Sequence, residues 1–381
     1  MLRTPKLGKP RRRIDMDVAA ILYTSGSTGL PKGVVLSHQN LVTGARSVAE
    51  FLENNANDVI LAVLPFSFDA GFSQLSTAFS AGASVVLIDY LLPRDIFDSL
   101  SRYRVTGLSG IPSLWSRLAR MDWPPEAVSH LRYVTSTGGV MPGETLRRLR
   151  ENLPDTKIFL MYGLTEAFRS TYLPPEQIDR RPNSIGKAIP NAEVLVVRDD
   201  GSICEPGESG ELVHRGSLVT LGYWDDPSET AKRFRPTPNQ PRGRRYPEIA
   251  VYSGDTVRTD DEGYLYFVGR NDDMIKSSGY RISPTEVESV VYETGLVSEC
   301  AAYGIPHPLL GQAIALACIS ESPSKATSNA ILAACKKMLP AYMVPSEIYY
   351  LDDLPRTSNG KVARNTLARG HGTQTTRSPT T

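Results

Sequence analysis

The most informative stretch of this chain is YTSGSTGLPKG, which occupies residues 23–33. Its glycines let backbone N–H groups approach an anion closely, its hydroxyl side chains add donors, and Lys32 adds a positive charge. The residues predicted to bind phosphate are Thr24, Ser25, Gly26, Ser27, Thr28, Gly29 and Lys32. The stretch is not a Walker A loop, because Pro31 precedes the lysine and removes a backbone donor. We predict a phosphate-binding loop here; the alternative is an ordinary polar turn.

The segments around this loop predict an α/β fold. The apolar run VAAILY at 18–23 predicts a buried strand before the loop, and Ser37 can cap a helix whose apolar residues recur through 41–52. Further apolar runs predict strands at 59–65, 83–88, 105–111, 131–137 and 157–163, and an amphipathic stretch predicts a helix at 143–153. Such alternation is typical of a layered α/β fold whose parallel strands are buried on both faces.

The second half of the chain has a different pattern. Short strands with turn signals, such as Asp199-Asp200-Gly201, indicate a β-rich subdomain between about 185 and 270. Beyond Asp272 the pattern predicts helices at 284–294 and 328–339 and strands at 300–305, 313–319 and 345–351, enough for a small α+β domain. We therefore expect a basic tail at 1–13, a large domain at 14–271, a small domain at 272–370 and a flexible tail at 371–381.

Length and composition exclude several classes of protein. A chain of 381 residues is too long for one hydrophobic core, so two domains are expected. The balance of 42 Lys and Arg against 41 Asp and Glu lacks the positive field that nucleic-acid binding needs. The four cysteines form no CxxC motif and the five histidines form no zinc motif. No apolar run is long enough to span a membrane, so we expect a cytoplasmic protein.

Several motifs resemble one known family. YTSGSTGLPKG is similar to the signature of the adenylate-forming superfamily, which contains acyl-CoA ligases, luciferases and the adenylation domains of peptide synthetases. The other family motifs follow in order as YGLTE at 162–166, YSGD at 252–255, GRNDDMIK at 269–276 and PRTSNGK at 355–361. The resemblance implies an ATP-dependent ligase that makes an acyl adenylate, releases pyrophosphate and passes the acyl group to coenzyme A. Its implied cofactors are ATP, Mg²⁺ and coenzyme A, and its implied pathway is fatty acid metabolism.

The chemistry of this reaction suits the residues in these motifs. A carboxylate must attack the α-phosphate of ATP, so negative charge has to be neutralised. The hydroxyl of Thr165 can reach the α-phosphate, and Glu166 can hold Mg²⁺ as a hard oxygen ligand, although a glutamate at a strand end can also be merely solvated. The resemblance assigns Asp255 and Arg270 to the ribose. It also implies that Lys361 bridges the carboxylate and the α-phosphate, whereas alone it is typical of a surface lysine.

Further positions take a role only from the resemblance. Those implied to contact the nucleotide or coenzyme A are Gly138, Gly139, Tyr162, Gly163, Lys276 and Gly279. The bare backbone of Gly279 would leave room for the pantetheine arm, and Asp272 resembles the hinge about which the small domain rotates. The glycines are also typical of ordinary turns, and Tyr162 of a core residue.

The acyl pocket is predicted from Asp69 and Ser136. The sequence FDAG at 68–71 is similar to the FDAS of amino-acid adenylation domains, in which the aspartate pairs with the α-ammonium group. If Asp69 acts in this way, the chain is a standalone adenylation protein that loads the phosphopantetheine thiol of a separate carrier protein. Against this, YGLTEAFRSTYLPPE at 162–176 resembles acyl-CoA ligases associated with exosortase A gene clusters. We favour the acyl-CoA ligase and keep the amino-acid reading as the alternative.

The chain departs from the family near its start. Family members carry an N-terminal subdomain before the phosphate loop, but here the loop begins 23 residues in. We expect a truncated reading frame, with a separate chain as a candidate source of the missing subdomain. Truncation leads to a third reading, namely an inactive remnant that still binds nucleotide; against decay stand the intact residues Lys32, Glu166, Asp255, Arg270 and Lys361.

Overall fold

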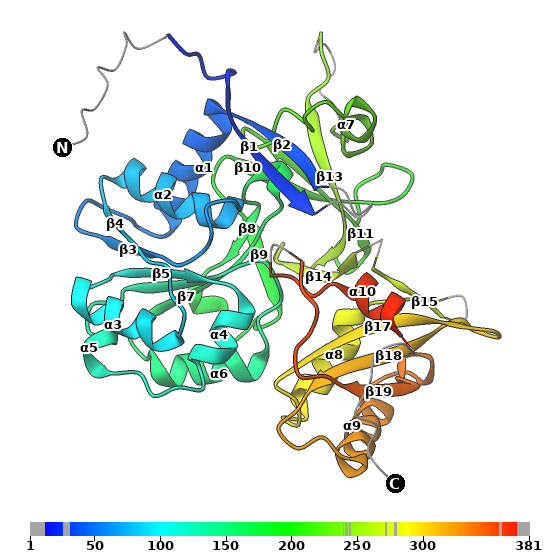
Figure 1. Ribbon diagram of the computed structural model, residues 1–381. Coiled ribbons are helices and arrows are strands. Elements are labelled where there is room, and N and C mark those ends of the chain that lie inside the picture. The colour runs from blue at the N-terminus through cyan, green and yellow to red at the C-terminus, as the bar shows by residue number, and fades with distance from the viewer. Residues whose placement is uncertain are drawn as a thin grey trace.

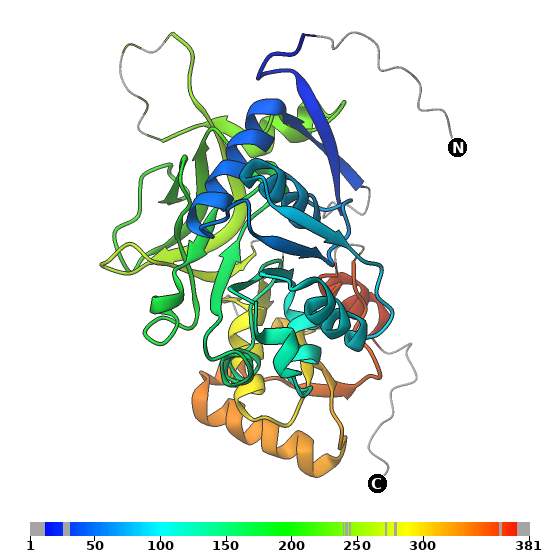
Figure 2. The ribbon, with the colours of Figure 1, turned by 90° about the vertical axis from the view of Figure 1, so that its left-hand side faces the viewer.

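The computed structural model describes residues 12–25, 31–238, 240, 243, 245–270, 273–277, 280–357 and 360–371, with the side chains of Ser25, Pro31, Lys276 and Arg281 left aside. Within these residues a twelve-stranded sheet carries most of the chain and a five-stranded sheet forms the C-terminal part. Figure 2 shows the five-stranded sheet at the lower end of the molecule, next to the helices of the larger part. The predicted fold class is confirmed.

Five parallel strands form one half of the large sheet. Their order is β4 (Ser84–Leu87), β3 (Val59–Ala62), β5 (Gly107–Gly110), β6 (Tyr133–Ser136) and β7 (Lys157–Tyr162). Helices α1 (His38–Phe51) and α2 (Asp69–Ala81) cover one face, and α3 (Pro93–Tyr103), α4 (Pro112–Leu118), α5 (Pro125–Val128) and α6 (Gly143–Asn152) cover the other (Figure 1). The two faces bury separate apolar clusters, one around Trp115 and one around Phe168. The predicted alternation of strands and helices is therefore confirmed.

Mostly antiparallel strands extend this sheet. Beyond β7 the order is β8 (Thr171–Leu173), β9 (Ser184–Ala188), β14 (Leu265–Arg270), β13 (Ile249–Thr259), β11 (Ser209–Gly216) and β10 (Ala192–Val197), with β12 (Phe234–Pro236) paired to β13. The 3₁₀ turns η1 (Thr165–Ala167) and η2 (Pro175–Gln177) and helix α7 (Pro227–Arg233) lie in the connections. These strands are the β-rich region that the sequence predicts between about 185 and 270.

The small sheet has its own core. Its strands are β16 (Tyr280–Ile282), β15 (Ile275–Ser277), β18 (Gly311–Ile319), β17 (Glu299–His307) and β19 (Glu347–Tyr350), and its helical segments are α8 (Pro284–Glu293), α9 (Lys325–Met338), η3 (Ala341–Met343) and α10 (Arg364–Gly370). Helix α9 begins at Lys325, three residues before the predicted start, because the Ser324 side chain accepts a hydrogen bond from the Thr327 N–H and caps it.

The prediction of a buried strand at 18–23 is wrong in part. Among the described residues, strand β1 (Val18–Ser25) pairs only with β2 (Pro31–Ser37), in an antiparallel hairpin outside both sheets. Leu22 is buried, but Val18 is 50% and Tyr23 is 58% exposed. The hairpin reaches the rest of the molecule through β2, where the Trp224 N–H donates to the Gly33 carbonyl over 2.7 Å. An apolar run alone cannot show that only one face of its strand is covered.

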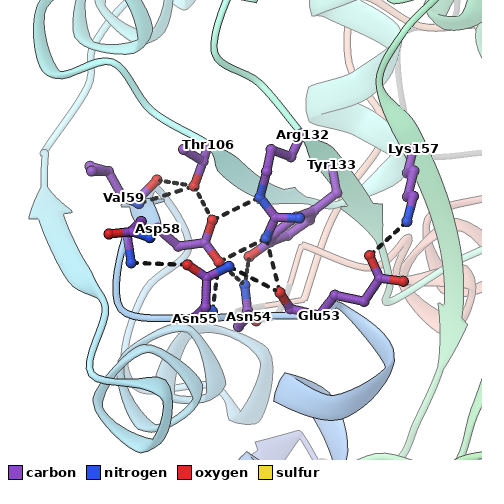
Figure 3. Close-up of polar contacts among 10 residues, drawn as sticks. Glu53, Asn54, Asn55, Asp58, Val59, Thr106, Arg132, Tyr133 and Lys157 are labelled. Carbon is purple, nitrogen blue, oxygen red and sulfur yellow. Dashed lines mark hydrogen bonds and ion pairs between the residues drawn. The ribbon is translucent and has the colours of Figure 1, made fainter.

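A polar cluster joins the amino ends of the parallel strands, at the edge opposite the candidate site (Figure 3). Asp58, which directly precedes β3, is buried, and both of its carboxylate oxygens accept hydrogen bonds from Arg132, over 2.9 and 2.7 Å. Thr106 and Asn54 donate to the same carboxylate. Burial alone raises the pKa of Asp58, but these hydrogen bonds bring it down to about 2. The cluster therefore ties strands β3, β5 and β6 together through one charged group.

Candidate active site

The candidate site lies where the parallel strands end. Ser136 is the last residue of β6, Tyr162 is the last of β7, and Thr165 and Glu166 lie in η1 directly after it. Because the strands are parallel, their carboxyl ends share one edge of the sheet, which is where α/β folds usually bind ligands. Gly138 adopts φ 86°, and a Cβ there would lie 3.5 Å from Ile111 in the loop after β5.

Three predicted residues form one cluster, held by a hydrogen bond and an ion pair. The Tyr162 hydroxyl donates to Oδ2 of Asp255 over 2.6 Å, and Nε of Arg270 lies 3.1 Å from Oδ1 of the same carboxylate. The register of β13 and β14 sets Asp255 directly opposite Arg270. Burial raises the pKa of Tyr162 well above its usual value, and the Asp255 charge raises it further, so the phenol stays a donor. The structure thus brings together residues more than 90 positions apart in the sequence.

Glu166 has a partner that the sequence did not indicate. The Tyr223 hydroxyl donates to Oε1 of Glu166 over 2.5 Å, and the Thr220 N–H donates to the Glu166 backbone carbonyl over 3.0 Å. Burial and the Glu166 charge raise the pKa of Tyr223, which keeps its proton available for this bond. Burial lowers the pKa of Arg270, but nearby negative charges, with Asp255 the largest and Glu166 a smaller one, raise it overall. In the sequence, the one feature that marks this position is the glycine before Tyr223. In the structure that glycine, Gly222, adopts φ 115°.

Lys32 lies near Tyr223, the tyrosine that donates to Glu166. Its Nζ donates to Oε2 of Glu229 over 2.5 Å and lies 5.6 Å from the centre of the Tyr223 ring. Hydrogen bonds from Lys232 and then Lys32 bring the pKa of Glu229 down to about 2. Lys32, the predicted cation of the phosphate loop, is therefore held by helix α7 and lies near the ring whose hydroxyl donates to Glu166. Thr24 lies opposite Lys32 in the hairpin, whereas Gly26, Ser27, Thr28 and Gly29, and the Ser25 side chain, lie outside the described residues.

The Lys361 turn reaches the same edge of the large sheet. Gly360 adopts φ 75°, and a Cβ on it would lie 3.0 Å from Cδ1 of Ile111, the residue that also touches Gly138. The turn is closed by the Thr357 N–H, which donates to the Lys361 carbonyl over 2.8 Å. The Lys361 side chain is exposed, so its amine is free to change position. The small sheet thus presents this lysine beside the site.

The remaining predicted residues have different outcomes. Gly139 lies beside Pro112, and a Cβ on Gly163 would lie 3.2 Å from the backbone of Arg169, so both glycines line close approaches of the chain. Lys276 belongs to β15, but only its backbone is described. Asp272 and Gly279 lie outside the described residues.

A small cavity lies beneath this edge, between the sheet and helices α1 and α2. Ala70, next to Asp69 at the start of α2, lines it together with Thr135 and Thr137 of the β6 end and Met161 of β7. Ser136 is buried, and its Oγ has no hydrogen-bond partner among the described residues. The cavity also touches Arg169, a buried cation that the sequence analysis did not single out.

Comparison with known proteins identifies the family. The site gathers polar side chains at the carboxyl edge of a parallel sheet, with a lysine-bearing turn of the C-terminal part beside them. The sequence model of the AMP-binding enzyme family matches residues 5–224, and that of its C-terminal domain matches residues 286–361. The chain belongs to the AMP-binding enzyme family.

Individual relatives are CoA ligases and carrier-protein ligases. The chain is 29% identical to the oxalate–CoA ligase of Saccharomyces cerevisiae over 92% of this chain and 63% of the relative. It is 34% identical to the L-proline–[L-prolyl-carrier protein] ligase of Streptomyces coelicolor over 91% of this chain and 64% of the relative. The o-succinylbenzoate CoA synthetase of Bacillus subtilis, solved with its acyl-adenylate intermediate, superposes with a TM-score of 0.81 at 31% identity, covering 93% of this chain and 69% of that one.

The matches cover only part of each relative. The chain spans less than two thirds of the length of the two curated relatives. The comparisons lend no support to a separate chain that supplies an N-terminal subdomain, and the narrower resemblance to exosortase-associated ligases stays a prediction. No helix within the described residues is both long enough and apolar enough to cross a membrane.

Proposed function

We propose that the protein activates a carboxylic acid with ATP and transfers the acyl group to coenzyme A. The observation that carries this proposal is the convergence on one sheet edge of the Tyr162–Asp255–Arg270 cluster, of Glu166 with its donor Tyr223, and of the Lys361 turn. The CoA ligases among the relatives support the choice of reaction.

Residues of this chain have a role in both steps of this reaction. Asp255 accepts hydrogen bonds from the ribose hydroxyls, with Arg270 and Tyr162 orienting its carboxylate. In the first step a carboxylate oxygen attacks the α-phosphorus, the bond to the β-phosphate breaks, and pyrophosphate leaves. Lys32 and Lys361 neutralise the charge that develops on the phosphate oxygens. In the second step the thiol sulfur of coenzyme A attacks the acyl carbon, AMP leaves, and the thiol proton passes to solvent.

Mg²⁺ fits the residues around Glu166. The described residues contain no group of three or more His, Cys, Asp or Glu side chains that could hold a metal. Mg²⁺ usually takes one or two carboxylates together with substrate phosphates, so a single carboxylate suits a nucleotide-borne ion. Glu166 would hold it, and Tyr223 orients that carboxylate. When bound, the ion would neutralise charge on the phosphates.

The proposal includes the domain division expected from the sequence. A large domain at 14–271 would bind the nucleotide, and a small domain at 272–370 would rotate about Asp272, because the Lys361 turn must leave before the thiol can enter. The bare backbone of Gly279 would then line the path of the pantetheine arm. A cytoplasmic location, where ATP and coenzyme A are supplied, belongs to the same proposal.

Carrier-protein loading is the second candidate function. It is favoured by the relative that acts on a prolyl carrier protein and by Asp69, which opens helix α2 beside the cavity. In this reading Asp69 would bind an α-ammonium group and the acceptor thiol would belong to a carrier protein. An inactive remnant is disfavoured by the intact Tyr162–Asp255–Arg270 cluster.

Pyrophosphate exchange into ATP tests the proposal. We expect exchange that depends on an added carboxylic acid, and a thioester when coenzyme A is present, across a panel of fatty, aromatic, dicarboxylic and amino acids. Asp255→Asn serves as the negative control, because it removes the negative charge that pairs with Arg270 and would accept hydrogen bonds from the ribose. Absence of acid-dependent exchange with every acid in the panel contradicts the proposal, and exchange with amino acids alone favours the second candidate.

Replacement of Tyr223 by phenylalanine is expected to raise the KM for Mg²⁺–ATP. The change removes a hydrogen bond to a charged carboxylate, worth about 1.5 kcal/mol or more, so we expect roughly a tenfold increase. Steady-state kinetics at several Mg²⁺ concentrations measures it. The matched control is Tyr266→Phe, which removes a phenol that donates to Asp260 in a turn outside the site. Equal effects of the two variants would argue against a role for Glu166 in metal binding.

A further inference from the structure

Arg169 is a buried cation with few partners. Its side chain lines the cavity beneath the sheet edge, and the residue is 3% exposed. Nη1 donates to the Thr137 hydroxyl over 3.0 Å, while Nε has no hydrogen-bond partner among the described residues. No carboxylate of the described part of the chain lies within ion-pair distance of this guanidinium. Such an arrangement is costly unless another group satisfies the charge.

The backbone is strained at the residue that aims this arginine. Phe168 adopts φ 56° and ψ −55°, and the Arg169 N–H donates to the Ala167 carbonyl over 2.6 Å. This is a γ-turn of the rare form with a positive φ, which is unfavourable for a residue with a side chain. The fully buried Phe168 ring holds it in place against α1, where a Cβ on Gly44 would lie only 2.6 Å from the ring. Packing therefore maintains a turn that directs Arg169 inward, and such strain is concentrated at functional sites.

The cavity itself is small, and polar side chains line part of it. Its free volume is about 20 Å³, the room that one ordered water needs. Gln74 also lines it, and Oε1 of Gln74 is buried without a hydrogen-bond partner among the described residues. A long apolar acyl chain would have to displace the guanidinium, whereas one small anionic group would satisfy it.

Asp69 does not act as the anion that pairs with Arg169. Burial lowers the pKa of Arg169, and the charge of Asp69 offsets this only in part, which indicates an interaction through space and no direct pair. The positive charge of Arg169 in turn opposes the binding of an α-ammonium group beside Asp69. This repulsion favours an acid without an amino group.

We propose that Arg169 binds a second carboxylate of the substrate, so that the acid activated at this site is a short dicarboxylic acid. This inference rests on the proposed function, since one carboxylate must be left at the sheet edge to attack ATP. Thr137 and Met161, which line the cavity, directly precede the site residues Gly138 and Tyr162. The two ends of a four- or five-carbon diacid would then lie at the sheet edge and at the guanidinium.

Matched pairs of acids test the proposal. Pyrophosphate exchange is measured with succinate against butyrate and with glutarate against valerate, which have equal carbon numbers. We expect kcat/KM to be about a hundredfold higher for the diacids, because a monoacid leaves the buried guanidinium unsatisfied. In Arg169→Met this preference should disappear or invert, and in Arg169→Lys part of it should remain. A wild-type preference for the monoacids, or for L-glutamate over glutarate, overturns the proposal.

Binding measured without turnover separates this inference from the proposed function. Calorimetric titration or thermal stabilisation with succinate and butyrate reports on Arg169 even in the absence of exchange, and should show succinate binding to the wild type and not to Arg169→Met. Exchange with monoacids but no preference for diacids contradicts only the role of Arg169. If Arg169→Met does not fold, Arg169→Lys and the wild-type ratios decide the question.

Discussion

Replacement of Lys361 by alanine is expected to slow formation of the acyl adenylate by 10²–10³-fold. Loss of one preorganised donor at a developing oxyanion costs about 3–4 kcal/mol, and the lysine ammonium is such a donor at the α-phosphate. The Gly360 backbone already lies against Ile111 at the sheet edge, so the turn that carries the exposed Lys361 is beside the site. Acid-dependent pyrophosphate exchange measures this step.

The second half-reaction provides the internal control for Lys361. Once the adenylate exists, attack by a thiol no longer needs a cation between the carboxylate and the α-phosphate, so transfer from a synthetic acyl adenylate to coenzyme A should be nearly unchanged. Lys337 is an exposed lysine on helix α9, which packs on the small sheet, and Lys337→Ala should affect neither step. Full pyrophosphate exchange in the Lys361 variant would falsify the assignment.

Replacement of Asp58 by asparagine is expected to destabilise the fold by about 3 kcal/mol. The change leaves Arg132 without its counter-ion while that guanidinium is 34% exposed, so the cost should lie at the lower end of the range for a broken buried pair. Urea unfolding followed by circular dichroism measures it. Glu144→Gln is the matched control, because Glu144 pairs with Arg147 and Arg148 at the surface. This change should lower the free energy of unfolding by less than about 1 kcal/mol.

The same carboxylate predicts a dependence of stability on pH. The folded-state pKa of Asp58 is about 2 against 3.8 for the free group, so its contribution of about 2 kcal/mol is fully present above roughly pH 5 and is lost as the pH falls towards 2. In Asp58→Asn this part of the acid destabilisation should be missing. Identical pH profiles for the wild type and the variant would show that Asp58 does not titrate in this way.

Predictions from the sequence succeeded where the signal is contiguous. The apolar runs that became β3, β5, β6 and β7 are short and bounded by turns, so periodicity and length identified them. The strand at 18–23 was misjudged because its burial depends on whether another segment covers its second face. Ser324, a local cap signal before α9, was overlooked, and the predicted helix therefore began too late.

The residues of the candidate site also fall into two groups, those that the sequence selects and those that it misses. Glu166, Asp255, Arg270 and Lys361 stand in motifs whose residue types state their chemistry, so the sequence alone was enough to select them and to indicate the family. Tyr223 and Arg169 were missed. Tyr223 belongs to no motif, and Arg169 lies within the quoted stretch 162–176, where nothing in the residue type distinguishes it from a surface arginine.

By itself, then, the sequence determined the family and the order of strands and helices, and it proposed most residues of the candidate site. The tertiary structure alone decided which of them meet: Tyr162 with Asp255, Tyr223 with Glu166, and Arg169 with the cavity. The physical reason is that strand pairing and helix packing are collective, so the contacts of a side chain, and the water removed from around its charge, depend on segments far away in the chain.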